Sequence, residues 1–214
     1  MRYLMINADD FGMCQSMNAA TIGLLEDNLI TSATLMPPCP WFVEAAQYAA
    51  SHPDKCIGVH LTLTSEWEFM RWGTIARQPL PSLMTKGYFP KGSLEVEQNA
   101  KEHEVEVELR AQLELVKTYG LNPSHIDNQM GSLYGWHGVQ SFLPLAFKLC
   151  AELAVPFRFP KKLLDNDGIT ATLPAHSLDK MPEAIALAQS MGVPLVDYIM
   201  APPFAAFPNE SYEG

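Results

Sequence analysis

Short β-rich runs alternate with stretches of helical period along the whole chain, and this alternation constrains the fold more than any other feature. Strands that alternate with helices form parallel sheets. The chain therefore predicts an α/β fold, with a (β/α) barrel and a doubly wound open sheet as the two alternatives. We expect strands over Tyr3–Ala8, Ile30–Met36, Cys56–Leu63, Ser124–Asn128, Val155–Phe159 and Pro194–Met200.

Apolar residues spaced three and four apart predict the intervening helices. One begins with Ser16 as its N-cap, and a long charged amphipathic helix ends before Gly120. The stretch 64–93 has no clear period and is rich in aromatic residues. A long aromatic loop in a compact domain is more often functional than idle. The other expected helices cover Phe42–Ala50, Leu94–Tyr119, Val139–Leu153 and Pro182–Met191.

Composition excludes several classes of protein. The chain has 214 residues, of which 48% are hydrophobic and 18% charged, and this balance excludes disorder. A net charge of −10 argues against nucleic acid and anionic membrane surfaces as partners. The first apolar run is too short for a signal peptide, and the four cysteines share no CxxC spacing. We expect a cytoplasmic protein with buried, reduced thiols.

Ionisable residues gather at the predicted strand ends, where parallel sheets bind ligands. Asp9 and Asp10 end the first strand, His60 lies in the third, and His125 and Asp127 lie in the fourth. A carboxylate and two imidazoles suit a divalent cation with open positions for water. Taken singly, the aspartate pair also fits a turn or helix cap, and each histidine also fits a satisfied core position.

Three motifs together resemble the YdjC-like carbohydrate deacetylases. They are NADDFG at Asn7–Gly12, GVHLTLT at Gly58–Thr64 and SHID at Ser124–Asp127, in the order and at about the spacing of that family. The resemblance implies a distorted (β/α) barrel of the glycoside hydrolase/deacetylase type. It also implies a divalent metal, usually Mg²⁺ with Zn²⁺ as the alternative. The implied reaction removes an N-acetyl group from a small amino sugar or chitooligosaccharide, with or without a phosphate.

Residue by residue, the resemblance implies Asp10, His60 and His125 as metal ligands. It implies Asp9 as the base that takes a proton from the attacking water. A cation would stabilise the oxyanion and acidify the water, so these roles agree with the chemistry of amide hydrolysis.

Polar and aromatic residues beside these motifs are our candidates for binding the sugar. We assign Asp127 and Asn128 to hydrogen bonds, and Trp67 and Trp72 to stacking on pyranose rings, although each tryptophan equally fits a small satellite core. Family members are rich in histidine just after the SHID motif, whereas this chain continues with Asn128 and Gln129. These two amides can hydrogen-bond a sugar but cannot titrate near neutral pH.

The chain reads as one YdjC-like domain over residues 1–214, with a barrel that is incomplete at its C-terminal side. The segment that carries the family's general acid has no counterpart, which leaves His137 and His176 as weak substitutes. Two other functions stay open. One is a hydrolase of a disaccharide phosphate that uses Asp9 and Asp127 as a carboxylate pair. The other is a sugar-binding remnant without turnover. We expect a small carbohydrate as the partner and leave a homodimer open.

Overall fold

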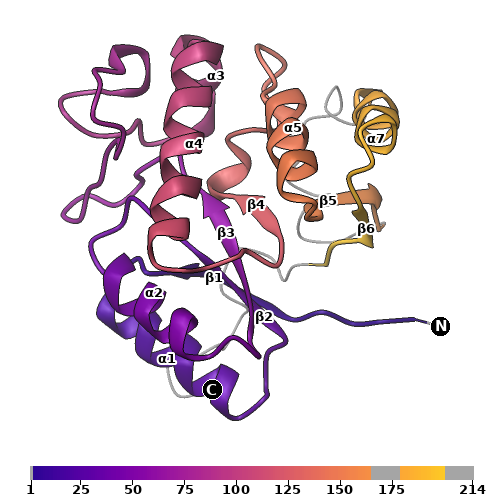
Figure 1. Ribbon diagram of the computed structural model, residues 1–214. Coiled ribbons are helices and arrows are strands. Elements are labelled where there is room, and N and C mark those ends of the chain that lie inside the picture. The colour runs from indigo at the N-terminus through magenta and orange to yellow at the C-terminus, as the bar shows by residue number, and fades with distance from the viewer. Residues whose placement is uncertain (1, 165–178, 201–214) are drawn as a thin grey trace, which may run out of the picture.

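Six parallel strands form one sheet in the computed structural model, which describes residues 2–164 and 179–200. Each strand pairs with the next one along the chain, so the spatial order equals the sequence order (Figure 1). Doubly wound sheets reverse their strand order at a switch point, whereas barrels do not. The sheet is therefore of the barrel type, and within the described residues it is open between β1 and β6. The strands are β1 (Asn7–Phe11), β2 (Ser32–Leu35), β3 (Cys56–Leu61), β4 (Ile126–Asn128), β5 (Phe157–Lys162) and β6 (Leu195–Tyr198).

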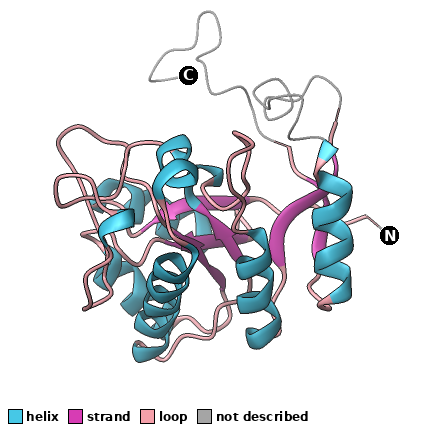
Figure 2. Ribbon diagram, turned by 90° about the horizontal axis from the view of Figure 1, so that it is seen from above, coloured by secondary structure: helices cyan, strands magenta, loops and turns pink. Residues whose placement is uncertain are grey.

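The helices cover one face of the sheet. Crossovers between parallel strands are right-handed, so a sequential strand order puts all of them on the same side. Helix α1 contacts β1, α2 contacts β2, α4 contacts β3 and α5 contacts β5. Figure 2 shows the helices in cyan and the strands of the sheet in magenta. The described helices are α1 (Gln15–Glu26), α2 (Phe42–Ser51), α3 (Ser93–Asn99), α4 (Glu102–Thr118), α5 (Leu143–Leu153) and α7 (Met181–Ser190), with short 3₁₀ turns η1 (Pro81–Leu83) and η2 (Gln129–Gly131).

The two faces of the sheet differ in chemistry. Val59, Leu61 and Ile126 are fully buried, and they alternate along their strands with His60 and Asp127. Side chains alternate between the faces of a strand, so the apolar residues lie on one face and the polar residues on the other. Because the apolar face packs under the helices, the polar face is the one that lines the interior of the open barrel.

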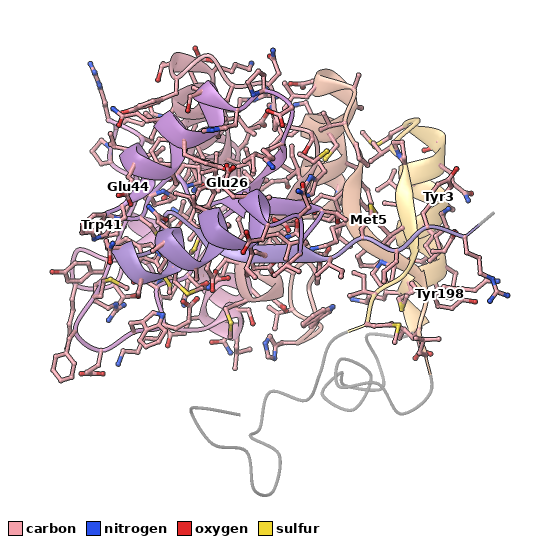
Figure 3. All side chains as sticks on the ribbon, turned by 90° about the horizontal axis from the view of Figure 1, so that it is seen from below. Tyr3, Met5, Glu26, Trp41, Glu44 and Tyr198 are labelled. Carbon is pink, nitrogen blue, oxygen red and sulfur yellow. The ribbon has the colours of Figure 1, made fainter. Side chains whose placement is uncertain are left out.

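The first strand begins later than predicted. We expected Tyr3–Ala8, but β1 covers Asn7–Phe11, and the preceding stretch lies outside the sheet. Tyr3 and Met5 are 83% and 64% exposed in this stretch (Figure 3). Apolar character alone placed the strand too early, and the acidic pair belongs to the strand itself.

The long charged helix expected over Leu94–Tyr119 is two helices. The backbone turns extended at Ala100 and Lys101, with ψ of 132° and 131°. Ser82 lies at this break, where its hydroxyl accepts a hydrogen bond from the amide of Lys101 at 2.9 Å. The carboxylate of Glu104 accepts one from the amide of Ser82 at 2.8 Å. The long loop therefore supplies hydrogen-bond partners for the residues at the start of α4.

Buried glutamates hold other loops to these helices. Glu108 on α4 is fully buried and accepts hydrogen bonds from the amides of Ile75 and Ala76 at 3.0–3.2 Å. Glu97 on α3 is 1% exposed and accepts from the amides of His137 and Val139. A buried carboxylate is tolerated when several donors satisfy it. The acidic residues of α3 and α4 thus position the loops at this end of the molecule.

The remaining helix predictions hold with small changes. Helix α2 and helix α7 lie where we expected them, whereas α5 begins at Leu143 instead of Val139. The prediction of Ser16 as the N-cap of α1 is wrong, because Ser16 lies inside the helix and the N-cap is Cys14, which makes no side-chain cap. Cys39 and Cys150 are buried as expected, but Cys56 is exposed. None of the helices in residues 2–164 and 179–200 has the length and apolar character needed to span a bilayer.

Candidate metal centre and catalytic site

A β-bulge in β1 carries the two aspartates. Ala8 pairs with Ala33 and Phe11 pairs with Leu35, so Asp9 and Asp10 together oppose the single residue between Ala33 and Leu35. Asp10 has φ of +63°, a left-handed conformation that costs free energy for any residue with a Cβ. A bulge re-aims the side chains beside it. Neighbouring strand residues normally face opposite sides, yet here both carboxylates lie close to His60.

His60 is 2% exposed and has acceptors at both ring nitrogens. Its Nδ1 lies 2.5 Å from Oδ1 of Asp127, at the paired position of β4. Its Nε2 lies 2.9 Å from Oε1 of Gln129 and 3.8 Å from Oδ1 of Asp10. Burial alone would lower the pKa of His60, but the carboxylates of Asp127, Asp9 and Asp10 raise it to about 9. The imidazole is therefore the centre of the cluster.

Arg158 of β5 occupies the Nδ1 side of this cluster. Its guanidinium donates to both carboxylate oxygens of Asp9, at 2.8 and 2.7 Å, and forms an ion pair of 2.7 Å with Oδ2 of Asp127. Burial would raise the pKa of Asp9, but the charges of His60 and Arg158 and the hydrogen bond from Arg158 lower it to about 2. Asp9 is thus ionised and held in one orientation.

Asp9, His60 and Asp127 could hold a metal ion, because each offers one ligand atom and these atoms lie within 4.8 Å of one another. On this side, however, the guanidinium of Arg158 already forms ion pairs with both carboxylates. A second cation here would lie next to a fixed positive charge. The Nε2 side of His60 lacks such a competitor among the contacts of the described residues.

The Nε2 side has the features of a cation site. Oδ1 of Asp10 and Oε1 of Glu66 are buried and have no hydrogen-bond partner among the described residues. Burial raises the pKa of Asp10, and the charges of Asp9 and Glu66 add to that rise. Buried orphaned oxygens are costly unless a cation or donor satisfies them.

The histidine itself is arranged as a metal ligand. A carboxylate on Nδ1, here that of Asp127, fixes the ring and presents Nε2 to an ion. The donor set beside Nε2 therefore fits a divalent cation.

His125 does not join the other two expected ligands. It precedes β4, where its backbone carbonyl accepts from the amide of Val59, and its ring lies against Gly58, two residues before His60. An added Cβ at Gly58 would come within 2.7 Å of that ring. Because Ile126 pairs with Val59 and Asp127 pairs with His60, His125 lies beside Gly58 instead of beside His60. Burial is the main cause that lowers its pKa.

Two residues expected to bind substrate have other partners. Asp127 is fully buried between His60 and Arg158, so it orients these side chains and cannot reach a sugar. Asn128 is 5% exposed, and its Oδ1 accepts from the amide of Leu133 at 3.0 Å. Asn128 thus stabilises the turn that follows β4 through this hydrogen bond.

The two tryptophans of the long loop differ in exposure. Trp72 is 3% exposed, and its indole N–H donates to the carbonyl of Thr64 at 2.7 Å. It is a core residue of the loop and offers no face to a ligand. Trp67 is 54% exposed and directly follows Glu66, whose Oε2 accepts from the carboxamide of Gln129. Trp67 is therefore the one of the two that remains available for stacking.

The histidines proposed as a general acid are not part of this cluster. The ring of His137 contacts the hydroxyl of Ser93 at 3.0 Å, at the start of α3. His176 lies outside the described residues.

Sequence reasoning missed the roles of Arg158, Gln129 and Glu66. Arg158 lies between Phe157 and Phe159 in a strand predicted to be buried, and a buried arginine requires a carboxylate partner. That signal was available. The positions of Gln129 and Glu66 depend on turns whose course no local pattern gives.

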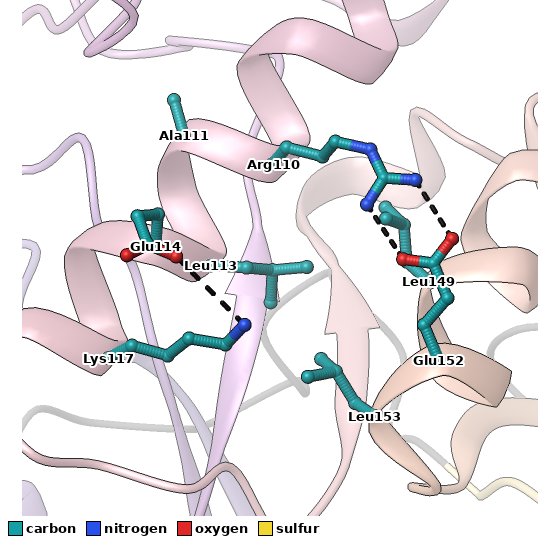
Figure 4. A pocket seen from close by; sticks show the side chains of 8 residues that line it. All are labelled: Arg110, Ala111, Leu113, Glu114, Lys117, Leu149, Glu152 and Leu153. Atoms are coloured by element: carbon teal, nitrogen blue, oxygen red, sulfur yellow. Dashed lines mark hydrogen bonds and ion pairs between the residues drawn. The ribbon is translucent and has the colours of Figure 1, made fainter.

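A groove of about 380 Å³ lies between α4 and α5, away from these residues (Figure 4). Leu113, Leu149 and Leu153 contribute its apolar lining, and Arg110 pairs with Glu152 across it at 2.7 Å. None of the residues around His60 lines it, so it is a space between helices rather than part of the site.

Comparison with known proteins finds carbohydrate deacetylases among the relatives of this chain. A carbohydrate deacetylase of Brevibacillus brevis is 35% identical over 158 residues, which are 73% of this chain and 59% of that protein. A chitooligosaccharide deacetylase of Proteus mirabilis is 26% identical over 169 residues, 78% of this chain and 62% of that protein. The chain thus spans about three fifths of the length of these relatives.

A solved structure has the same fold. A protein of Enterococcus faecalis V583, provisionally named a cellobiose-phosphate cleavage protein, superposes with a TM-score of 0.67 and 29% identity, over 91% of this chain and 65% of that one. The family model described as YdjC-like protein matches residues 3–211. With the match extending over nearly its whole length, the chain belongs to the YdjC-like protein family.

Proposed function

We propose that this chain is a metal-dependent carbohydrate deacetylase, which removes the acetyl group from a small N-acetylated amino sugar or chitooligosaccharide. The observation that carries the proposal is the pairing of His60 with Asp127, which turns Nε2 toward the orphaned oxygen of Asp10. The names of the relatives support the same reaction class. The chain spans 59% and 62% of the length of these two relatives, and the acetate assay below tests its own activity.

Asp10 and His60 would hold the cation. A bound divalent ion supplies Lewis-acid polarisation of an amide carbonyl and lowers the pKa of water. Mg²⁺ is the ion that we expect, with Zn²⁺ as the alternative. Asp127 contributes indirectly, because it fixes the ring of His60.

Asp9 would accept the proton of the attacking water. It is ionised at any physiological pH, and its side chain is 41% exposed. Within the described residues, its Oδ2 accepts a hydrogen bond from Arg158 alone. A carboxylate oxygen has a second lone pair for a further bond. With a pKa of about 2, Asp9 is a weak base, so it can take a proton only from an acidified water.

Arg158 would keep Asp9 in place during this transfer. Its fork binds both oxygens and leaves the carboxylate little rotational freedom. Trp67 would supply a stacking face for a pyranose ring at the rim.

Glycosidic cleavage by a carboxylate pair is the weaker reading. Asp127 is fully buried and paired with both His60 and Arg158, so it cannot protonate a leaving sugar. Asp127 therefore does not form, with Asp9, the catalytic carboxylate pair that the sequence predicted for this chemistry.

The test is an acetate assay. The purified chain is incubated with N-acetylglucosamine, diacetylchitobiose or its phosphate, with Mg²⁺, Mn²⁺ or Zn²⁺, and with Asp9→Asn at equal metal content as the control. Acetate from the wild type alone supports the proposal. Release of a monosaccharide would indicate glycosidic cleavage. Sugar binding without either product would indicate a binding protein.

A further inference from the structure

We propose that Gln129 is a protein ligand of the cation through its carboxamide Oε1, so that oxygen donors outnumber nitrogen at the site and favour a hard ion such as Mg²⁺ or Mn²⁺. This inference rests on the metal site of the proposed function. The ligand that it adds takes the place that we first gave to His125.

The position of Oε1 carries the proposal. It lies 2.9 Å from Nε2 of His60. Adjacent ligands of an octahedral ion with bonds of about 2.1 Å lie about 3 Å apart. Oδ1 of Asp10, at 3.8 Å from the same nitrogen, lies between the adjacent and opposite spacings of such an ion. Nε2 and Oε1 are at hydrogen-bond distance, which is also the spacing of adjacent ligands, so a cation could replace the proton between them, with Oδ1 of Asp10 nearby.

Glu66 fixes the direction of the carboxamide. The Nε2 of Gln129 donates to Oε2 of Glu66 at 3.2 Å, which leaves Oε1 facing His60. The other oxygen of Glu66 is buried without a partner among the described residues. Glu66 is thus an orienting residue for Gln129, and its free oxygen adds negative charge to the site.

The backbone holds Gln129 at the end of β4. Gln129 is 8% exposed and begins η2, where Met130 has φ of +52°. Gly131 packs so tightly that an added Cβ would come within 2.8 Å of the ring of Trp136. The amide of Leu133 returns to Asn128 at 3.0 Å. This closed turn restricts the side chain to the position beside His60.

The donor chemistry sets the preference. Carboxylate and carboxamide oxygens suit Mg²⁺ and Mn²⁺, whereas protein zinc sites are built mainly from imidazoles and thiolates. One imidazole with oxygens from Asp10 and Gln129 is a hard set. A histidine at position 129 would add a second nitrogen and shift the set toward zinc.

The experiment measures metal binding by the full chain. Mn²⁺ affinity is determined by electron paramagnetic resonance and Zn²⁺ affinity by competition with a chelating dye, for the wild type, Gln129→Ala, Gln129→His and the surface control Gln47→Ala on α2. We expect Gln129→Ala to weaken Mn²⁺ binding about tenfold or more. Gln129→His should raise the ratio of Zn²⁺ to Mn²⁺ affinity by about tenfold. The control should match the wild type.

Wild-type affinities in a folded Gln129→Ala variant would overturn the inference, as would an unchanged metal ratio in Gln129→His. Circular dichroism establishes folding, and Gln129→His provides the second measurement if Gln129→Ala does not fold. Loss of Mn²⁺ in Asp9→Asn but not in Asp10→Asn would place the ion at the Nδ1 side and refute it. Metal binding with the expected ratios but no acetate release would leave this inference standing and remove the deacetylase proposal.

Discussion

The guanidinium of Arg158 grips both carboxylate oxygens of Asp9, a residue 149 positions earlier in the chain. This contact links β5 to β1 across the polar face of the sheet, and it gives the first prediction. Arg158→Ala should lower kcat at least tenfold while metal binding stays within a few fold, because Asp9 loses its orientation and the buried Asp127 keeps only His60 of its two cationic partners. The free energy of unfolding should fall by roughly 3 kcal/mol.

Arg158→Lys is the matched control for this prediction. Lysine keeps the charge but not the two-pronged donor, so kcat should lie between those of the wild type and Arg158→Ala. Steady-state kinetics and urea unfolding measure both effects. A wild-type kcat in Arg158→Ala would show that Asp9 needs no such support.

The adjacent aspartates should separate metal binding from turnover. Asp10→Asn removes a charged oxygen beside Nε2 of His60, so metal affinity and activity should fall together. Asp9→Asn should keep the metal, because Arg158 rather than the ion occupies its side, yet lose turnover at least a hundredfold. Calorimetry with Mn²⁺ and the acetate assay distinguish the two. Equal metal loss in both variants would contradict these roles.

Relief of the backbone strain at Asp10 should increase the stability of the fold, but loss of its carboxylate should abolish metal binding. Its φ of +63° suits glycine better than any residue with a Cβ. Asp10→Gly should therefore raise the free energy of unfolding by about 1 kcal/mol while abolishing metal binding. Asp10→Asn, which tolerates the same backbone conformation, should show the loss of metal without the full gain. Thermal unfolding without metal tests this, and a destabilised Asp10→Gly would refute the assignment of strain.

The free energy of unfolding should depend on pH through Glu108, which binds the long loop. Burial raises its pKa above the ordinary value, so the folded state binds this proton more tightly than the unfolded state. Stability that Glu108 contributes in its protonated form is then lost as pH rises through its folded pKa. Relative to Glu108→Gln, the wild type should lose unfolding free energy as the pH rises from about 4.5, the ordinary pKa of a glutamate, through the raised pKa of the folded state. Urea unfolding across this range checks the sign.

Loss of the same side chain should free the loop. Glu108→Ala removes the acceptor of the amides of Ile75 and Ala76, which should cost about 1–3 kcal/mol. Glu114→Gln on the exposed side of α4 serves as the control for both variants. Equal pH slopes in the wild type and Glu108→Gln would contradict the buried titration.

Substitutions of the two tryptophans should change different properties, the stability of the fold for Trp72 and the KM for the sugar for Trp67. Trp72→Ala should destabilise the fold by about 3–5 kcal/mol, because the buried indole fills the core of the loop and donates to Thr64. Trp67→Ala should leave stability nearly unchanged and raise KM for the sugar severalfold. Kinetics and thermal unfolding of both variants decide. Unchanged KM in Trp67→Ala would exclude stacking on this ring.

Local pattern predicted the strands and most helices, because burial on one face of an element leaves a period in the sequence. It did not place the break at Ala100 and Lys101, since the partner that stabilises this break, Ser82, comes from a distant loop. Nor could it decide between a barrel and a doubly wound sheet, which differ only in the spatial order of the strands.

The candidate site was predicted in part for a similar reason. Asp9, Asp10 and His60 lie in motifs that the resemblance singled out, and the structure brings them together. His125 and Asp127 are two residues apart on the same face of the strand, so the register of β4 against β3 decides which one meets His60. The register of one strand against another is a long-range property. The alternation of side chains within a single strand does not determine it.

The sequential order of the strands has a consequence for biosynthesis. Because every strand pairs with its predecessor, β1 to β3 can assemble on the nascent chain before the ribosome has made β4. The acidic bulge and His60 would then be in place early. The guanidinium that pairs with both Asp9 and Asp127 arrives only with β5. Until then, the emerging protein holds these two close carboxylates with the imidazole of His60 but without Arg158.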